Sequence, residues 1–205
     1  MRIIAGTYRS RILKSPKDLS LRPTSDYLRE TLFNVLGSGI SGSRFLDVFA
    51  GTGAVGIEAL SRGATQATFI EKHAPTAALI RKNLALLKIN SGATVISADA
   101  VRALETLETK MQTGEAPYDY IFIDPPYAST EDYSRVLQHL ASHRLLACDG
   151  IVIVEHRKTF NTPEQIADLK RVRLLRQGDA ALSFYRRPTA ISPDPVAASE
   201  PEPAG

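Results

Sequence analysis

The run Asp124-Pro125-Pro126-Tyr127 combines residue types that could act on the amino group of a nucleobase. Such an amine is a weak nucleophile because its lone pair is delocalised into the ring. The Asp124 carboxylate and the Pro125 carbonyl could each accept one of its N–H bonds, and the prolines restrict the backbone that carries these acceptors. Tyr127 offers a face on which an unstacked base could lie, worth about 1–3 kcal/mol. We therefore expect Asp124, Pro125, Pro126 and Tyr127 to form the catalytic group; the alternative is a rigid proline turn.

A second run, Gly51-Thr52-Gly53-Ala54-Val55-Gly56, matches the G-x-G-x-x-G pattern between a strand and a helix. Glycines let the backbone pass close to a ligand, and the amino end of the helix offers free N–H groups. The pattern predicts a ligand that contains a nucleotide, but it does not identify that ligand, because a dinucleotide-dependent dehydrogenase would have the same pattern. A tight strand-to-helix turn is the purely structural alternative.

Three acidic residues favour S-adenosylmethionine as that ligand. Asp47 lies within the strand before the run 51–56, here called the glycine loop. From there it could reach the ammonium group of an amino-acid moiety, a cation that NAD lacks. Glu71 and Asp99 end the next two strand patterns, where they could accept from a ribose diol and an adenine amino group. Carboxyl ends of parallel strands meet at one edge of a sheet. The expected cofactor contacts are Asp47, Phe49, Gly51, Thr52, Gly53, Glu71, Lys72, Asp99 and Ala100.

Strand and helix patterns alternate regularly from residue 44 onward. Short apolar runs indicate buried strands, and the stretches between them carry apolar residues at helical spacing. We expect an α/β, Rossmann-like fold whose parallel sheet has helices on both faces, closed by an antiparallel hairpin at Gly178-Asp179. The expected strands are 45–51, 67–71, 93–99, 119–127, 150–156, 171–177 and 181–187, and the expected helices are 54–63, 74–88, 101–110 and 133–146.

The amino-terminal part of the chain is basic. Its first thirty residues hold seven Lys or Arg and three Asp or Glu, a net charge of +4, whereas the whole chain carries +3. Residues 2–13 read as a hairpin, or two short strands interrupted at residues 5–7, with Arg9 and Arg11 on one face of the second strand. A helix should follow, with Thr24 or Ser25 as its N-cap and Gly37 at its end. A basic excess at one end is typical of an arm that binds a polyanion, and a solvated basic surface is the alternative.

Other features limit the function classes. The single cysteine, Cys148, excludes an intramolecular disulfide and is interpreted as a packing residue. No metal site, signal peptide or membrane span is expected, so we predict a cytoplasmic protein without an obligate protein partner. Residues 189–205 are rich in Pro, Ala and Ser and are expected to be disordered. The predicted organisation is a basic extension (1–40), a catalytic domain (41–188) and a tail (189–205).

The chain resembles the RsmD family, bacterial methyltransferases that act on guanine N2 in 16S ribosomal RNA. The resemblance rests on RIIAGTYRSRIL, LRPTSDYLRETLFNVL, FLDVFAGTGAVGIEALSRGA, TFIE, KNL and IFIDPPY, between Arg2 and about His156. It implies a seven-stranded S-adenosylmethionine-dependent fold with an N-terminal basic β-hairpin, and a substrate within a 30S subunit or an assembly intermediate. Tyr127 stands where some relatives carry Phe. The residues expected to touch RNA are Arg2, Arg9, Arg11, Arg22, Thr24 and Arg29, with Thr24 and Arg29 on a helix that covers the cofactor.

Three other functions are compatible with parts of this pattern. A DNA adenine-N6 methyltransferase could use Asp124-Pro125-Pro126-Tyr127 on its own amine, although such enzymes usually add a larger target-recognition region. A non-catalytic RNA-binding assembly factor could keep a cofactor pocket, but it would not need that run. An NAD-dependent reductase is disfavoured by Asp47.

Overall fold

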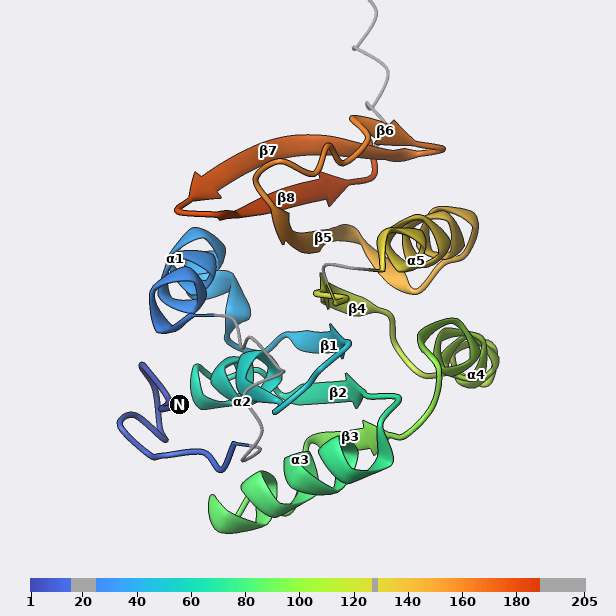
Figure 1. Cartoon of the computed structure of the whole chain (residues 1–205). Coiled ribbons are helices and arrows are strands. Elements are labelled where there is room, and N and C mark those ends of the chain that lie inside the picture. The colour runs from blue at the N-terminus through green and yellow to red at the C-terminus, as the bar shows by residue number, and fades with distance from the viewer. Residues whose placement is uncertain (16–24, 127–128, 189–205) are drawn as a thin grey trace, which may run out of the picture.

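The computed structural model of the chain describes residues 1–15, 25–126 and 129–188. Its strands belong to one sheet, seen edge-on in Figure 1. They are β1 (Arg44–Val48), β2 (Gln66–Ile70), β3 (Ala93–Ile96), β4 (Tyr118–Ile123), β5 (Leu146–Arg157), β6 (Gln165–Ile166), β7 (Leu169–Gln177) and β8 (Ala180–Arg186).

The sheet has the order β3-β2-β1-β4-β5-β8-β7-β6. Strands β3, β2, β1, β4 and β5 are parallel, and β8, β7 and β6 continue the sheet in antiparallel pairing. This arrangement confirms the predicted Rossmann-like α/β class and the terminal hairpin at Gly178-Asp179. The sheet has eight strands where seven were expected, because the two-residue β6 pairs with the outer side of β7.

Helices cover both faces of the sheet, which explains why β1 and β2 are buried along almost their whole length. The helices are α1 (Asp26–Leu36), the 3₁₀ helix η1 (Gly37–Ile40), α2 (Ala54–Ser61), α3 (Ala74–Leu86), α4 (Ala100–Gln112) and α5 (Thr130–Ser142). Apolar side chains of α1, α2 and α3 pack on one face, and those of α4 and α5 on the other. In Figure 1, α1 to α3 lie to the left and front of the sheet and α4 and α5 to its right.

The N-terminal segment, residues 1–15, forms a hairpin with little regular strand. An isolated antiparallel bridge joins Arg2 to Ile12, whereas residues 7–10 form a turn in which Ser10 has a φ of 66°. The expected alternation of Arg9 and Arg11 along a strand is therefore wrong. Ile3 and Leu13 are buried in the same core as α1 and α2, so this segment packs on the catalytic fold instead of standing apart from it. The proposed boundary at residue 40 stays a prediction.

Helix α1 begins as the sequence predicts. The Ser25 hydroxyl accepts a hydrogen bond from the Leu28 N–H at 3.1 Å, and Gly37 follows the last turn with a φ of 59°. Helix α5 was predicted three to four residues too late, because β5 already begins at Leu146. Cys148 lies exposed near the start of β5, so its interpretation as a packing residue is wrong.

Two further expectations concerned a membrane span and the carboxyl-terminal tail. No helix among the described residues has both the length and the apolar character needed to cross a membrane. The predicted tail, 189–205, lies outside the described residues.

Candidate functional site

The strand register brings the candidate residues to one edge of the sheet. Ile123 is paired with Val48, Val48 with Ile70, and Ile70 with Ile96, so these four residues form a row across β4, β1, β2 and β3. The next residues along three of these strands are Asp124, Phe49 and Glu71. The Asp124 N–H also donates to the Val48 carbonyl at 3.4 Å. Neighbouring strands lie about 4.8 Å apart, so the backbones at Asp124 and Glu71 are separated by roughly 10 Å across the glycine loop.

The glycine loop lies between Asp124 and Glu71 and has the backbone that a close ligand requires. Gly51 and Gly53 adopt φ values of 53° and 78°, and Phe49 has a φ of 65°. A positive φ at a bulky residue is strained, and such strain is typical of ligand sites. Gly56 serves packing, because a Cβ atom at this position would lie 2.3 Å from the Phe69 ring. It corresponds to the third glycine of the dinucleotide-type loop, which brings helix and strand close together.

Glu71 and Asp99 hold backbone groups next to this loop. The two oxygens of Glu71 accept from the Gly51 N–H at 2.9 Å and from the His73 N–H at 2.8 Å. Asp99 is the N-cap of α4, where it accepts from the Val101 N–H at 3.2 Å. Each carboxylate oxygen can accept more than one hydrogen bond, so both side chains remain able to receive a hydroxyl or amino group. Lys72 is exposed beside Glu71, and Ala100 is buried at the start of α4.

Asp47 differs from the other acidic residues because its carboxylate is buried. Only 2% of the residue is exposed, and its Oδ2 accepts from the Gly56 N–H at 2.9 Å. The side chain thus fixes the first turn of α2 and, through it, the glycine loop. Burial raises the pKa of Asp47 to about 7, and the nearby charges of Glu71 and Glu155 act in the same direction.

This pKa predicts a pH dependence of stability. Between about pH 4 and pH 7 the folded protein binds a proton at Asp47 that the unfolded chain releases, so the free energy of unfolding should fall as the pH rises through this range. Asp47→Asn keeps an oxygen for the Gly56 N–H and cannot titrate. We expect the wild type to lose on the order of 1–4 kcal/mol relative to this variant between pH 4 and pH 8. Urea unfolding at several pH values measures the difference, and parallel curves would refute the assignment.

The catalytic run follows β4 directly. Asp124 is half-buried, Pro125 is buried and Pro126 is exposed, whereas Tyr127 lies outside the described residues. The Pro125 carbonyl accepts a long hydrogen bond, 3.5 Å, from the Tyr133 hydroxyl on α5. This contact ties the carbonyl to the helix that follows, and the second lone pair of the oxygen can still accept an amine hydrogen. An open cavity of about 370 Å³ lies at the amino-terminal end of α5, lined by Thr130, Glu131, Ser134, Arg135 and Phe160.

Buried polar residues that the sequence analysis missed attach the N-terminal segment to α2 and α3. Glu58 on α2 accepts from the backbone N–H groups of Ile4 and Ala5 at 2.8 and 3.0 Å. Asn83 on α3 accepts from the Lys14 N–H at 2.8 Å and donates to the Thr52 carbonyl at 3.2 Å. The segment therefore lies along α2, with one of its ends beside the glycine loop. Since these partners are distant in sequence, no local pattern could have identified them.

Arg29 does not lie where the RNA-contact prediction places it. Its side chain is 1% exposed, within reach of Asp26 at 3.0 Å and Glu58 at 3.8 Å, and it donates to the Arg2 carbonyl at 2.5 Å. The structure therefore contradicts an RNA contact for Arg29: the guanidinium joins α1 to the N-terminal segment and α2. Arg2, Arg9 and Arg11 are exposed, as a polyanion-binding surface requires. Arg22 and Thr24 lie outside the described residues.

Comparison with known proteins places the chain among bacterial relatives. The family model described as Conserved hypothetical protein 95 matches residues 1–186. The ribosomal RNA small subunit methyltransferase D of Escherichia coli is 36% identical over 187 residues, which cover 91% of this chain and 90% of the relative. A solved structure of a hypothetical protein from Thermus thermophilus has a TM-score of 0.73, with 28% identity, and covers 91% of this chain and 99% of its own. An S-adenosylmethionine-dependent methyltransferase from Agrobacterium tumefaciens shares the fold, with a TM-score of 0.61, 13% identity and coverage of 83% and 64%.

Proposed function

Since this chain belongs to the family described as Conserved hypothetical protein 95, the RsmD family, we propose that it is an S-adenosylmethionine-dependent methyltransferase of ribosomal RNA. More specifically, it methylates the exocyclic N2 of a guanine in 16S RNA, within a 30S subunit or an assembly intermediate. The observation that carries the proposal is the placement of Asp124. Its backbone is bonded to Val48, the last residue of the strand that enters the glycine loop.

In this proposal, S-adenosylmethionine and the target guanine bind side by side at the carboxyl edge of the parallel strands. On the β1, β2 and β3 side, Glu71 would hold the ribose hydroxyls of S-adenosylmethionine and Asp99 its adenine amino group, and the glycine loop would supply backbone N–H groups beside them. Asp47 is a positioning residue, because it holds α2 and the loop through the Gly56 N–H. Phe49, Thr52, Lys72 and Ala100 complete the proposed cofactor contacts.

On the β4 side, the guanine amine lies between the Asp124 carboxylate and the Pro125 carbonyl. Two acceptors on its two N–H bonds would draw the nitrogen toward tetrahedral geometry and free its lone pair. The new N–C bond would then form in line as the bond between the methyl carbon and the sulfonium sulfur breaks, with S-adenosylhomocysteine as the leaving group. Rigid prolines keep the acceptors in place, so that little reorganisation accompanies the reaction. In this proposal Tyr127 supplies the surface on which the base stacks, and the proton leaves to Asp124 or to water.

The exposed arginines of the N-terminal segment bind RNA phosphates in this proposal. Reversing Arg9 and Arg11 to Glu should weaken RNA binding and make its salt dependence shallower, by a slope of about 1.4–1.8 if each arginine neutralises one phosphate. A matched control reverses Lys110 and Arg144, which are also exposed and change the net charge equally. Filter binding across a salt series measures both slopes. If the two double variants behave alike, the arginines act through net charge alone and the proposed contact is wrong.

The reaction itself can be tested with radiolabelled S-adenosylmethionine. Three substrates are compared: naked 16S RNA, small subunits from a strain that lacks the gene, and duplex DNA. We expect label in small-subunit RNA, and digestion to nucleosides should yield N2-methylguanosine. Label on adenine N6 of DNA would favour the DNA methyltransferase. Cofactor binding without transfer to any substrate would favour the assembly factor.

A further inference from the structure

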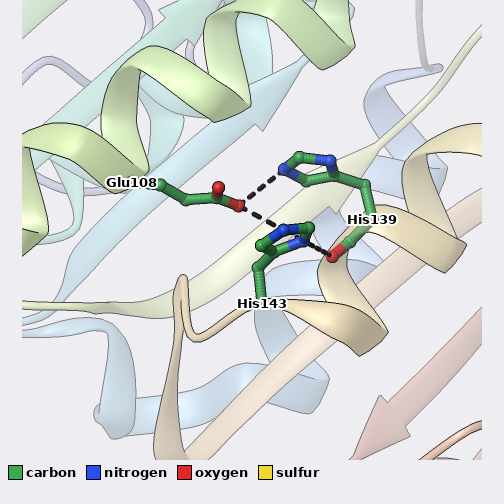
Figure 2. Close-up of side chains that lie close together, drawn as sticks. All are labelled: Glu108, His139 and His143. Atoms are coloured by element: carbon green, nitrogen blue, oxygen red, sulfur yellow. Dashed lines mark hydrogen bonds and ion pairs between the residues drawn. The ribbon is translucent and has the colours of Figure 1, made fainter.

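Glu108, His139 and His143 form a cluster that the proposed reaction does not use. Glu108 lies in the last half of α4, His139 in the last turn of α5, and His143 directly after α5 (Figure 2). The Glu108 Oε1 atom is 2.6 Å from His139 Nε2 and 3.6 Å from His143 Nδ1. One ligand atom from each residue lies within 4.8 Å of the other two. Carboxylate oxygen and imidazole nitrogen together are a ligand set that suits zinc.

The polar atoms at the centre of the cluster are buried. His139 Nε2 and Glu108 Oε1 have almost no solvent contact, and in the described part of the chain neither has a hydrogen-bond partner of good geometry. Glu108 Oε1 and His139 Nε2 therefore lie close together without forming a hydrogen bond of good geometry. Ligands at about 2.0–2.1 Å from a tetrahedral ion are about 3.3 Å apart, so small side-chain rotations would admit an ion between them.

The backbone that carries the histidines is held in place. His139 and His143 are four residues apart, and their rings stack with centroids 4.3 Å apart. Arg187 donates to the carbonyls of Leu140 and His143 at 2.8 and 2.7 Å, which fixes the chain where α5 ends. Glu108 comes from α4, which packs against α5 (Figure 1). A site on helices whose backbone is fixed loses little entropy when it binds an ion.

We propose that Glu108, His139 and His143 bind one Zn²⁺ ion, with water as the fourth ligand on the side where His143 is exposed. To reach the ion, His143 Nδ1 exchanges its present hydrogen bond to the His139 carbonyl for the metal. Helices between parallel strands run back toward the amino ends of those strands, so the cluster lies at the sheet edge opposite the glycine loop. The ion therefore joins the carboxyl ends of α4 and α5 and has a stabilising role. No metal site was expected from the sequence, because Glu108 is distant along the chain from both histidines.

Zinc binding by the full chain, with any affinity tag removed and after treatment with a chelator, tests the proposal. We expect isothermal titration to give a stoichiometry of about one, and zinc at about 100 times its dissociation constant to raise the melting temperature by about 5–10 °C. Glu108→Gln and His139→Gln should each weaken binding at least tenfold. Glu105→Gln, the same change at an exposed position on α4, should leave it unaltered.

Two results would overturn the site. In the first, the wild type binds no zinc at micromolar concentrations, which would leave the contact between Glu108 and His139 without a metal. In the second, binding survives in both Gln variants. The second result would place the ion elsewhere, for example at Cys148, which is exposed. Absorption of the cobalt-substituted protein gives an independent readout, since four-coordinate cobalt has intense visible bands that should disappear in His139→Gln.

Discussion

Glu58→Gln should lower the free energy of unfolding by about 3–5 kcal/mol, because it leaves the buried Arg29 guanidinium without its buried partner. Both side chains are at most 1% exposed. Burial also lowers the pKa of Arg29, which indicates how poorly its charge is solvated. In the wild type, the two oxygens of Glu58 accept hydrogen bonds from the Ile4 and Ala5 N–H groups. The amide nitrogen of Gln is a donor, so it would leave one of these N–H groups without an acceptor. Urea unfolding measures the loss, which corresponds to a fall of about 6–20 °C in melting temperature.

Two companion variants separate this effect from a general loss of acidic charge. Glu105→Gln removes an exposed carboxylate and should change stability by less than about 0.5 kcal/mol. Arg29→Met in the Glu58→Gln background should recover part of the loss, since the charge that has lost its buried partner is then gone. Trypsin should also cleave after Arg9 and Arg11 faster in Glu58→Gln, because the N-terminal segment loses its attachment. Wild-type stability in Glu58→Gln would contradict the buried ion pair.

The largest loss of activity is expected for Asp124→Ala, which removes one of the two proposed amine acceptors. We predict a fall of about 10²–10⁴ in the single-turnover rate of methyl transfer, with the affinity for S-adenosylmethionine changed less than about threefold. Asp124→Asn keeps one acceptor oxygen and should lose less. Rapid-quench transfer assays and calorimetric titration with the cofactor measure the two quantities separately.

Asp149→Ala is the matched control for this experiment, since Asp149 is exposed on β5. It should transfer methyl groups at the wild-type rate. If Asp124→Ala loses cofactor affinity as its main defect, Asp124 belongs to the cofactor site and the proposed role at the amine is wrong.

The parallel part of the fold could be predicted from the sequence because its signals are local. The run that holds Asp47 is otherwise apolar from Phe45 to Ala50, as strands buried on both faces usually are, and it ends at residues suited to loops. Strand order then follows from the general rules for such sheets, and it brings Asp124 beside the glycine loop. The positions of Glu71 and Asp99 at the same edge follow in the same way.

Features that depend on distant partners could not be predicted. An arginine next to Leu28 looks like a surface residue of an amphipathic helix, and only Glu58, on a different helix, makes a buried position possible for Arg29. The strand expected from residue 7 is replaced by a turn because Glu58 and Ser61 accept the N–H groups of residues 4, 5 and 8. The cluster of Glu108 with His139 likewise exists only once α4 and α5 pack together.

A structure of the protein with S-adenosylhomocysteine tests the central claim most directly. We expect the ribose hydroxyls within hydrogen-bonding distance of Glu71, and the sulfur atom on the β4 side of the loop. There the Asp124 carboxylate and the Pro125 carbonyl should face a space for an amine nitrogen, about 3–3.5 Å from the position that the methyl carbon would take in S-adenosylmethionine. A sulfur atom on the far side of the glycine loop, out of reach of Asp124, would contradict the proposed reaction.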